Sequence, residues 1–273
     1  RVERNTVLQT AKCGVLCAGQ SRTVFRNNAI LDGSQGGMWI RNSSAVHITG
    51  NSIRGNAKAG LQVGDESNPL VENNALLDGK NGGIVIHGSA RGYFVGNTLA
   101  GHAQAGVGVQ DEAAPVLVRN TLERNAAGGA IMAGRSKSVW HNNTVTRNAV
   151  VGVGLKEAAS ARLVGDSVEG NDGPGVLLQA NCHLTLQDCT VSANAKAEVI
   201  CAGASQLVAT GTTLNAEAAE DTVGIQCMES ARARLCQCGL RGHAGGNLVL
   251  QDSAEARATQ CAVAESAWAG VVL

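Results

Sequence analysis

A glycine recurs every 23 residues through most of the chain, and this spacing constrains the fold more than any other feature. The repeated glycines are Gly14, Gly37, Gly60, Gly83, Gly106, Gly129, Gly152 and Gly175. Position 198 holds Glu198 instead, a step of 26 residues leads to Gly224, and two further 23-residue steps reach Asn247 and Gly270. Self-similarity at a fixed period of this length indicates a solenoid, in which each repeat packs only on its neighbours.

The apolar residues follow the same period when each repeated glycine is taken as position zero. Positions one and three are apolar in nearly every repeat, as in Ile84 and Ile86, and positions eleven and sixteen are largely apolar, as in Phe94 and Leu99. Alternation by two predicts a strand with one buried face. We therefore predict an all-β solenoid, a parallel β-helix of about 11–12 coils with three short strands in each coil. A leucine-rich repeat has an overlapping period, but this chain lacks its leucine motif.

Two rows of asparagine accompany the repeat. Position fourteen holds Asn5, Asn28, Asn51, Asn74, Asn97, Asn120 and Asn143, then Asp166, Cys189, Thr212, Cys238 and Cys261. Stacked coils would place equivalent side chains about 4.8 Å apart, so inward-turned asparagines can bond one another in a ladder. Position nineteen holds Asn56, Asn125, Asn148, Asn171 and Asn194. We interpret this second row as corner residues, because asparagine tolerates left-handed backbone.

The overall composition limits the classes of binding partner and the cellular compartment that we expect. Lysine plus arginine and aspartate plus glutamate both number 22, which argues against a strongly basic surface for nucleic acid or an anionic membrane. No apolar run approaches the roughly 18 residues of a membrane-spanning helix. Nine cysteines, an odd number in a chain too long to need a disulfide framework, predict reduced thiols and a cytoplasmic location.

The stretch from about residue 57 to 145 carries motifs that resemble a known family. Its segments are Ser67-Asn68-Pro69, Asn74, Asp78-Gly79, Gly82-Gly83-Ile84-Val85-Ile86, Gly92, Asn97 and Ala103-Gln104-Ala105-Gly106-Val107. They resemble the right-handed parallel β-helix repeats shared by carbohydrate-binding proteins and sugar hydrolases. Within that group they are most similar to the β-helix of F-box ubiquitin-ligase adaptors and of the related SHC-binding spindle protein. The resemblance implies right-handed coiling, here of a single-stranded β-helix, and an intracellular interaction module. It does not imply ligase activity, because no F-box segment is present.

Both ends of the sequence fall inside a repeat. Asn5 already occupies position fourteen, and the chain stops at Leu273, just after a repeat opens at Gly270. Solenoids normally protect their terminal layers with polar caps. We therefore expect a single β-helix domain over residues 1–273 that is truncated in mid-coil at both ends, as a piece of a longer protein.

Carboxylates at position five are the main candidates for chemistry. They are Asp65, Asp111, Glu157, Glu229 and Asp252. Glu229 and Asp252 fall in adjacent repeats, so stacking would place them about 5 Å apart, the spacing of a retaining glycosidase pair. Cationic side chains recur at position eight. We interpret the carboxylates at position five and these cations as a rim of exchanged charges on the surface, without a catalytic role.

Other polar features are interpreted as structural. The three extra residues of the 26-residue step fall near residues 215–221, an acidic turn that could bind a cation or a basic partner. Cys201 and Cys227 would stack inward as small apolar groups. The histidines and cysteines lack zinc-site spacing, and we predict no metal and no cofactor.

The outward side chains of the strand that follows each repeated glycine form the candidate binding surface. Positions two and four should be polar if they met only water, but several are apolar, and an exposed apolar strip often marks an interaction surface. The predicted contacts are Trp39, Arg41, Val85, His87, Ile131, Leu177, Ile200 and Met228.

We therefore predict a non-catalytic interaction scaffold that binds a protein or peptide partner along this face, with no nucleic-acid or membrane partner. Such a module could recognise substrates in a ubiquitin-ligase adaptor or form a structural part of a large assembly. The alternative is a polysaccharide-binding or sugar-active β-helix protein, a lyase or a hydrolase.

Overall fold

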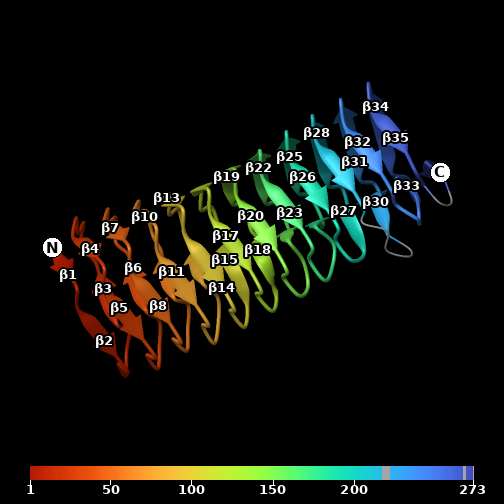
Figure 1. Ribbon diagram of the computed structural model, residues 1–273. Helices are drawn as coiled ribbons and strands as arrows, with labels where there is room; N and C mark the ends of the chain where they lie inside the picture. The colour runs from red at the N-terminus through yellow and green to blue at the C-terminus, as the bar shows by residue number, and fades with distance from the viewer. Residues whose placement is uncertain (217–221, 267–268, 273) are drawn as a thin grey trace.

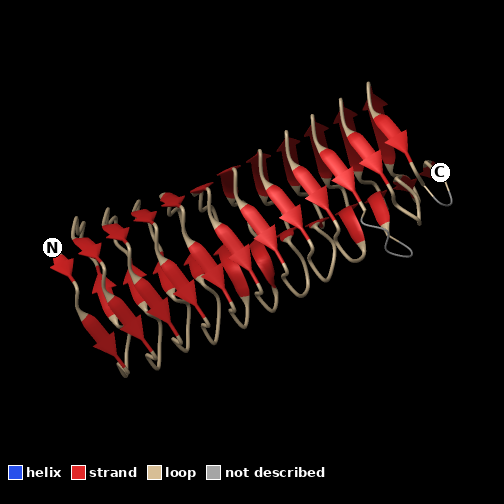
Figure 2. Cartoon of the chain, viewed as in Figure 1, coloured by secondary structure: helices blue, strands red, loops and turns tan. Residues whose placement is uncertain are grey.

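The computed structural model describes residues 1–216, 222–266 and 269–272, which wind into one elongated rod with the two termini at opposite ends (Figure 1). In these ranges short strands alternate with loops, and no helix is present that could cross a membrane (Figure 2). Each coil contributes one strand to each of three sheets, and equivalent strands of successive coils pair in parallel. Sheets A, B and C each contain 12 strands within the described residues.

Sheet A contains the strands that include position eleven of each repeat. They are β1 (Val2–Glu3), β4 (Val24–Arg26), β7 (His47–Thr49), β10 (Leu70–Glu72), β13 (Tyr93–Val95), β16 (Val116–Val118), β19 (Lys137–His141), β22 (Ser160–Val164), β25 (His183–Gln187), β28 (Gln206–Thr210), β31 (Arg232–Cys236) and β34 (Glu255–Thr259).

Sheet B contains the strands centred on position sixteen. They are β2 (Thr6–Leu8), β5 (Ala29–Leu31), β8 (Ser52–Arg54), β11 (Ala75–Leu77), β14 (Thr98–Ala100), β17 (Thr121–Glu123), β20 (Thr144–Thr146), β23 (Ser167–Glu169), β26 (Thr190–Ser192), β29 (Thr213–Asn215), β32 (Gly239–Arg241) and β35 (Ala262–Ala264).

Sheet C contains the strands that include positions one and two of each repeat. They are β3 (Val15–Cys17), β6 (Met38–Ile40), β9 (Leu61–Val63), β12 (Ile84–Ile86), β15 (Ala105–Val109), β18 (Gly128–Met132), β21 (Val153–Leu155), β24 (Val176–Leu178), β27 (Ala197–Cys201), β30 (Val223–Cys227), β33 (Leu248–Leu250) and β36 (Val271–Val272).

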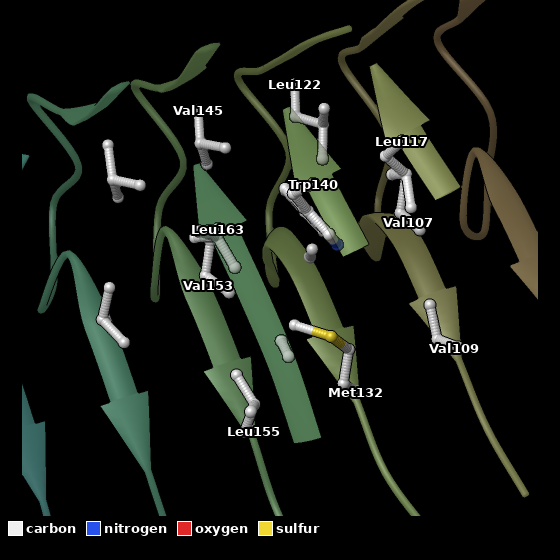
Figure 3. Close-up of a cluster of buried hydrophobic side chains, with 14 of the residues drawn as sticks. Val107, Val109, Leu117, Leu122, Met132, Trp140, Val145, Val153, Leu155 and Leu163 are labelled. Atoms are coloured by element: carbon white, nitrogen blue, oxygen red, sulfur yellow. The ribbon is translucent and has the colours of Figure 1, made fainter. Parts of the chain in front are cut away.

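The core is a stack of apolar layers inside the three sheets, as the period predicts. Ile84 and Ile86 are buried and pair in register with Val107 and Val109 of the next coil. Figure 3 shows this packing around Trp140, which is fully buried among aliphatic side chains from neighbouring coils. Glycine opens the sheet C strand because the coils approach closely there: a Cβ on Gly83 would lie only 2.6 Å from the carbonyl oxygen of the next repeated glycine.

The predicted asparagine ladder lies in the corner between sheets A and B. Asn97 Oδ1 accepts hydrogen bonds from both the N–H and the Nδ2 of Asn74, each at 3.0 Å. Asn97 Nδ2 in turn donates to the carbonyl of Val71 and to Asn120 Oδ1. Because these asparagines are buried, the ladder satisfies side chains and corner backbone that water cannot reach.

The second asparagine row also forms a buried ladder, in the corner between sheets B and C. Asn125 N–H and Nδ2 both donate to Asn148 Oδ1, at 3.1 and 3.0 Å. The left-handed residues precede each asparagine by one position, as in Gly55 before Asn56 and Arg147 before Asn148. The interpretation of this row as left-handed backbone is therefore wrong: the turn residue comes first, and the asparagine side chain then points inward.

His102 replaces one asparagine of the second row and forms equivalent hydrogen bonds. Its Nδ1 accepts from the N–H of Gly79 at 3.1 Å, and its Nε2 donates to the carbonyl of Leu76 at 3.0 Å. Burial lowers the pKa of His102, which keeps the imidazole neutral and able to accept at Nδ1.

Both ladders end toward the C-terminal coils. In the first row Asp166 still accepts from Asn143, but Cys189 and Thr212 follow it. In the second row Asn194 donates to Glu198 Oε2 at 2.5 Å. Glu198 replaces the usual glycine, is fully buried, and has its Oε1 3.7 Å from His243 Nε2.

Candidate functional site

The outer face of sheet C is the surface predicted to bind a partner, and we call it the sheet C face. It comprises three outward side chains of each repeat. One lies two residues before position zero, and the others lie at positions two and four. The eight predicted residues all lie on it and are all partly exposed: Trp39, Val85, Ile131, Leu177 and Ile200 at position two, and Arg41, His87 and Met228 at position four.

The structure brings two of the predicted residues together around a cavity. Val85 of β12 and Ile131 of β18 lie on either side of Gly108 in β15, in three consecutive coils. Because Gly108 has no side chain, the surface is hollowed between them, and the cavity has a volume of about 310 Å³. Polar side chains complete the lining, among them Asn81, Gln104, Gln110 and Lys156. Sequence reasoning missed this cavity because it searched for large side chains, whereas the signal was a missing one.

Near the N-terminal end of the face the predicted residues cover one another. The guanidinium carbon of Arg41 lies 4.7 Å from the ring centroid of Trp39, a cation–π contact. His87 Nε2 lies 2.9 Å from Gln62 Nε2, and its ring covers Gly64, where a Cβ would lie only 2.6 Å from the imidazole. Arg41 therefore covers part of the Trp39 ring, which is not a fully open platform.

Toward the C-terminal end the face is apolar and then polar. Leu177 of β24 and Ile200 of β27 are register neighbours and form a short apolar strip. Met228 lies beyond them, beside Gln226, whose Nε2 donates to Gln251 Oε1 at 3.1 Å. The predicted contacts thus form separate groups along the rod and not one continuous strip.

Among the described residues, every charged side chain on the sheet C face is cationic, a feature that sequence reasoning missed because it counted charge over the whole chain. The cations are Lys12, Arg41, Lys58, Lys156 and Lys196, and the amides that accompany them are Gln35, Gln62, Asn81, Gln104, Gln110, Gln179, Gln226 and Gln251. Within the described ranges no lysine takes part in an ion pair. The face therefore presents positive charge and amide hydrogen-bonding groups together.

The carboxylates at position five bond to backbone and do not form the predicted rim of exchanged charges. Asp65 Oδ2 accepts from the N–H of Asn42 in the preceding coil at 2.9 Å. The candidate pair is engaged in the same way: Glu229 Oε2 accepts from the N–H of Gly203 at 2.8 Å, and Asp252 Oδ2 from the N–H of Glu229 at 3.0 Å. The rim interpretation is wrong because position five is a left-handed corner residue whose carboxylate ties one coil to the one before.

The remaining candidates from the sequence are the cysteines, possible metal ligands and the acidic turn. All nine cysteines are free, and Cys201 and Cys227 pair in register on the buried inner face, as predicted. Across the described part of the chain no group of three or more histidine, cysteine or acidic side chains could hold a metal ion. Of the acidic turn predicted near residues 215–221, residues 217–221 lie outside the described ranges.

The chain belongs to the right-handed β-helix family, whose model matches residues 1–122 and 93–262. This match confirms the predicted right-handed parallel β-helix. Among curated proteins, none matches the chain in sequence.

Solved structures with the same fold include proteins named for action on polysaccharides. The periplasmic alginate epimerase AlgG is 18% identical, with a TM-score of 0.69 over 81% of this chain and 61% of its own. The A-module of the Azotobacter vinelandii mannuronan C-5 epimerase AlgE6 is 12% identical, with a TM-score of 0.58 over 98% of this chain and 87% of its own. The pectate lyase Pel9A is 12% identical, with a TM-score of 0.57 over 98% and 70%. At these identities the likeness concerns the fold, and this chain spans 61% of the length of the alginate epimerase.

Proposed function

We propose that the sheet C face binds an extended acidic polysaccharide, with the sugar chain lying along the rod. The observation that carries the proposal is the charge of the face: all its charged side chains are cationic, although the chain as a whole has a net charge of zero. Lysine attracts carboxylates, and amide side chains both donate to and accept from sugar hydroxyls. A repeating face of this kind matches a repeating polyanion.

The cavity at Gly108 is the place where one sugar unit would sit most deeply. Val85 and Ile131 provide apolar walls for the C–H faces of a ring, and Gly108 provides the hollow between them. Asn81 and Gln104 lie on one side for hydroxyls, and Lys156 lies on the other for a carboxylate. The combination of apolar walls with a few convergent polar groups is typical of small-ligand sites.

The structural comparisons support the ligand class. Alginate and pectate are acidic polysaccharides, and two of the similar structures are named for acting on them. The proposal concerns binding, and each of the carboxylates bordering this face accepts one backbone N–H hydrogen bond.

Affinity electrophoresis in gels containing polygalacturonate, alginate or neutral dextran tests the proposal. We expect retardation by the two acidic polymers and none by dextran. Lys156→Glu should weaken binding about tenfold, equivalent to about 1.4 kcal/mol. The matched control is Lys137→Glu, which makes the same charge change on sheet A and should leave binding within about twofold. Equal retardation by dextran, or equal loss in both variants, would contradict the proposal.

A protein-interaction scaffold is the second candidate function, and the apolar strip of Leu177 and Ile200 is the observation that favours it. A scaffold of this kind would suit the cytoplasmic substrate-recognition module of a ubiquitin-ligase adaptor or a part of a large assembly. Leu177→Lys discriminates between the two functions. It should abolish capture of a protein partner, because a charge would be buried against that partner, while adding to the positive charge available to an acidic polysaccharide.

A further inference from the structure

A separate cluster of cationic residues lies on the outer face of sheet A, across β28, β31 and β34. These three strands pair in parallel, and their register sets two rows of outward side chains side by side. The first row is Val208, Arg234 and Arg257, and the second is Thr210, Cys236 and Thr259. The six side chains line a cavity of about 350 Å³, together with Ala209 and Leu235.

The two arginines are direct neighbours on paired strands. Arg234 and Arg257 face each other across paired parallel strands, whose backbones lie about 4.8 Å apart. Like charges directly opposite one another destabilise a sheet. The adjacent Arg232 is compensated, since its Nε lies 3.3 Å from Glu255 Oε2, but in the described ranges neither Arg234 nor Arg257 takes part in an ion pair.

The repeat itself does not require arginine at these places. Position ten points outward, and the two preceding coils carry Thr185 and Val208 there. The core therefore gains nothing from the pair. What the pair provides is two exposed guanidinium groups beside a hollow whose other polar side chains, two threonine hydroxyls and a thiol, can all donate hydrogen bonds.

We propose that this cavity binds a tetrahedral oxyanion, a phosphate or sulfate group, between the guanidinium groups of Arg234 and Arg257. A guanidinium donates in a planar fork that matches two oxygens of such an anion. The anion would also remove the repulsion between the two cations, and the hydroxyls of Thr210 and Thr259 can complete its coordination. The site lies on sheet A, so it is independent of the polysaccharide proposed for sheet C.

Cys236 offers a local readout, because its partly exposed thiol lies in the cavity wall. The intact protein is alkylated with iodoacetamide in sodium chloride, sodium phosphate or sodium sulfate at equal ionic strength, and each cysteine is followed by mass spectrometry. We expect phosphate or sulfate to slow alkylation of Cys236 at least about fivefold relative to chloride. Cys13, also partly exposed but near the N-terminal end of the rod, is the internal control and should be unaffected.

Two variants make the result specific. Arg257→Gln should abolish the protection, and Arg234→Lys, which keeps the charge but loses the planar fork, should reduce it. Circular dichroism checks that both fold. Comparing the phosphate and sulfate arms identifies the preferred anion. The proposal would be overturned if Cys236 were alkylated equally fast in chloride, phosphate and sulfate, or if Cys13 were protected as well. Full protection of Cys236 in a folded Arg257→Gln variant would also overturn it.

Discussion

The buried corners and the sheet C face use the same 23-residue repeat in opposite ways. In the corners one residue type recurs, because each side chain must bond to its equivalent one coil away, as Asn97 does with Asn74 and Asn120. On the sheet C face position two changes from tryptophan to valine to glycine, because outward side chains need no equivalent neighbour. Stacking of the coils therefore constrains the residue types in the corners. The residue types on the sheet C face remain free to suit a ligand.

The corners themselves differ between the two parts of the rod. In the N-terminal coils a ladder side chain such as Asn120 bonds to backbone groups of the preceding coil and to the ladder side chain of the next coil. After Asp166 the same row holds cysteine and threonine, and Thr212 Oγ1 donates to the carbonyl of Thr210 in its own coil, at 3.2 Å. The N-terminal coils should accordingly depend on single ladder residues more than the C-terminal coils do.

The largest expected effect is the loss of one ladder residue. Asn120→Leu removes the acceptor for Asn97 and the donor to the carbonyl of Phe94, and leaves both buried groups unpaired. We expect the free energy of unfolding to fall by roughly 3–5 kcal/mol. Thr212→Val in the same row should cost about 1 kcal/mol, because a single hydrogen bond is lost. Urea denaturation of both variants measures the difference, and equal losses would remove the distinction between the two parts of the rod.

The next effect concerns Asp166, where the ladder acquires a carboxyl group. Burial raises the pKa of Asp166 to about 6, despite hydrogen bonds from Asn143 and Val164. Because the folded-state pKa is raised, the stability of the wild type should fall as pH rises from about 4 to about 6. Asp166→Asn should abolish that fall and stabilise the protein by about 2–3 kcal/mol at pH 7. Thermal melts at pH 4 and pH 7 test this, and a wild type more stable at pH 7 than the variant would contradict it.

A smaller effect of opposite sign is expected at His102. Burial lowers its pKa, so the neutral ring is favoured in the folded protein. The stability that it contributes is present above about pH 6.5 and decreases as pH falls below that value. His102→Asn restores the residue type of the row and should remove the decrease without loss at pH 7. A pH titration of the melting temperature should show a flatter acid limb in the variant than in the wild type.

The smallest effect on stability should come from the sheet C face. A Cβ on Gly108 would meet no atom closer than 3.8 Å and its backbone is unstrained, so Gly108→Leu should change the free energy of unfolding by less than about 0.5 kcal/mol. It should nevertheless fill the cavity and weaken polysaccharide binding about tenfold. The control is Gly239→Leu on sheet B, where no atom lies within 4 Å of the added Cβ. Unchanged polysaccharide binding by a folded Gly108→Leu variant would show that the cavity does not contribute to binding on the sheet C face.

The parts of the structure that the repeat constrains were also the parts predictable from the sequence. The strands, the buried positions and the ladder at Asn74 and Asn97 all follow from columns of identical or similar residues. The hydrogen bond that Asp65 accepts from backbone could not be predicted in this way, because a corner carboxylate has the same sequence pattern whether it bonds to a cation or to an N–H group. The cavity at Gly108 could not be predicted either, since its walls come from three coils and its centre is a missing side chain.

Lysine footprinting tests the central claim, that the sheet C face is the binding face, most directly. The protein is acetylated with and without polygalacturonate, and the modification of each lysine is measured by mass spectrometry. The account predicts protection of Lys58, Lys156 and Lys196 and unchanged modification of Lys137 on sheet A. Protection of Lys137 with Lys156 still exposed, or no protection of any lysine at saturating polymer, would contradict it.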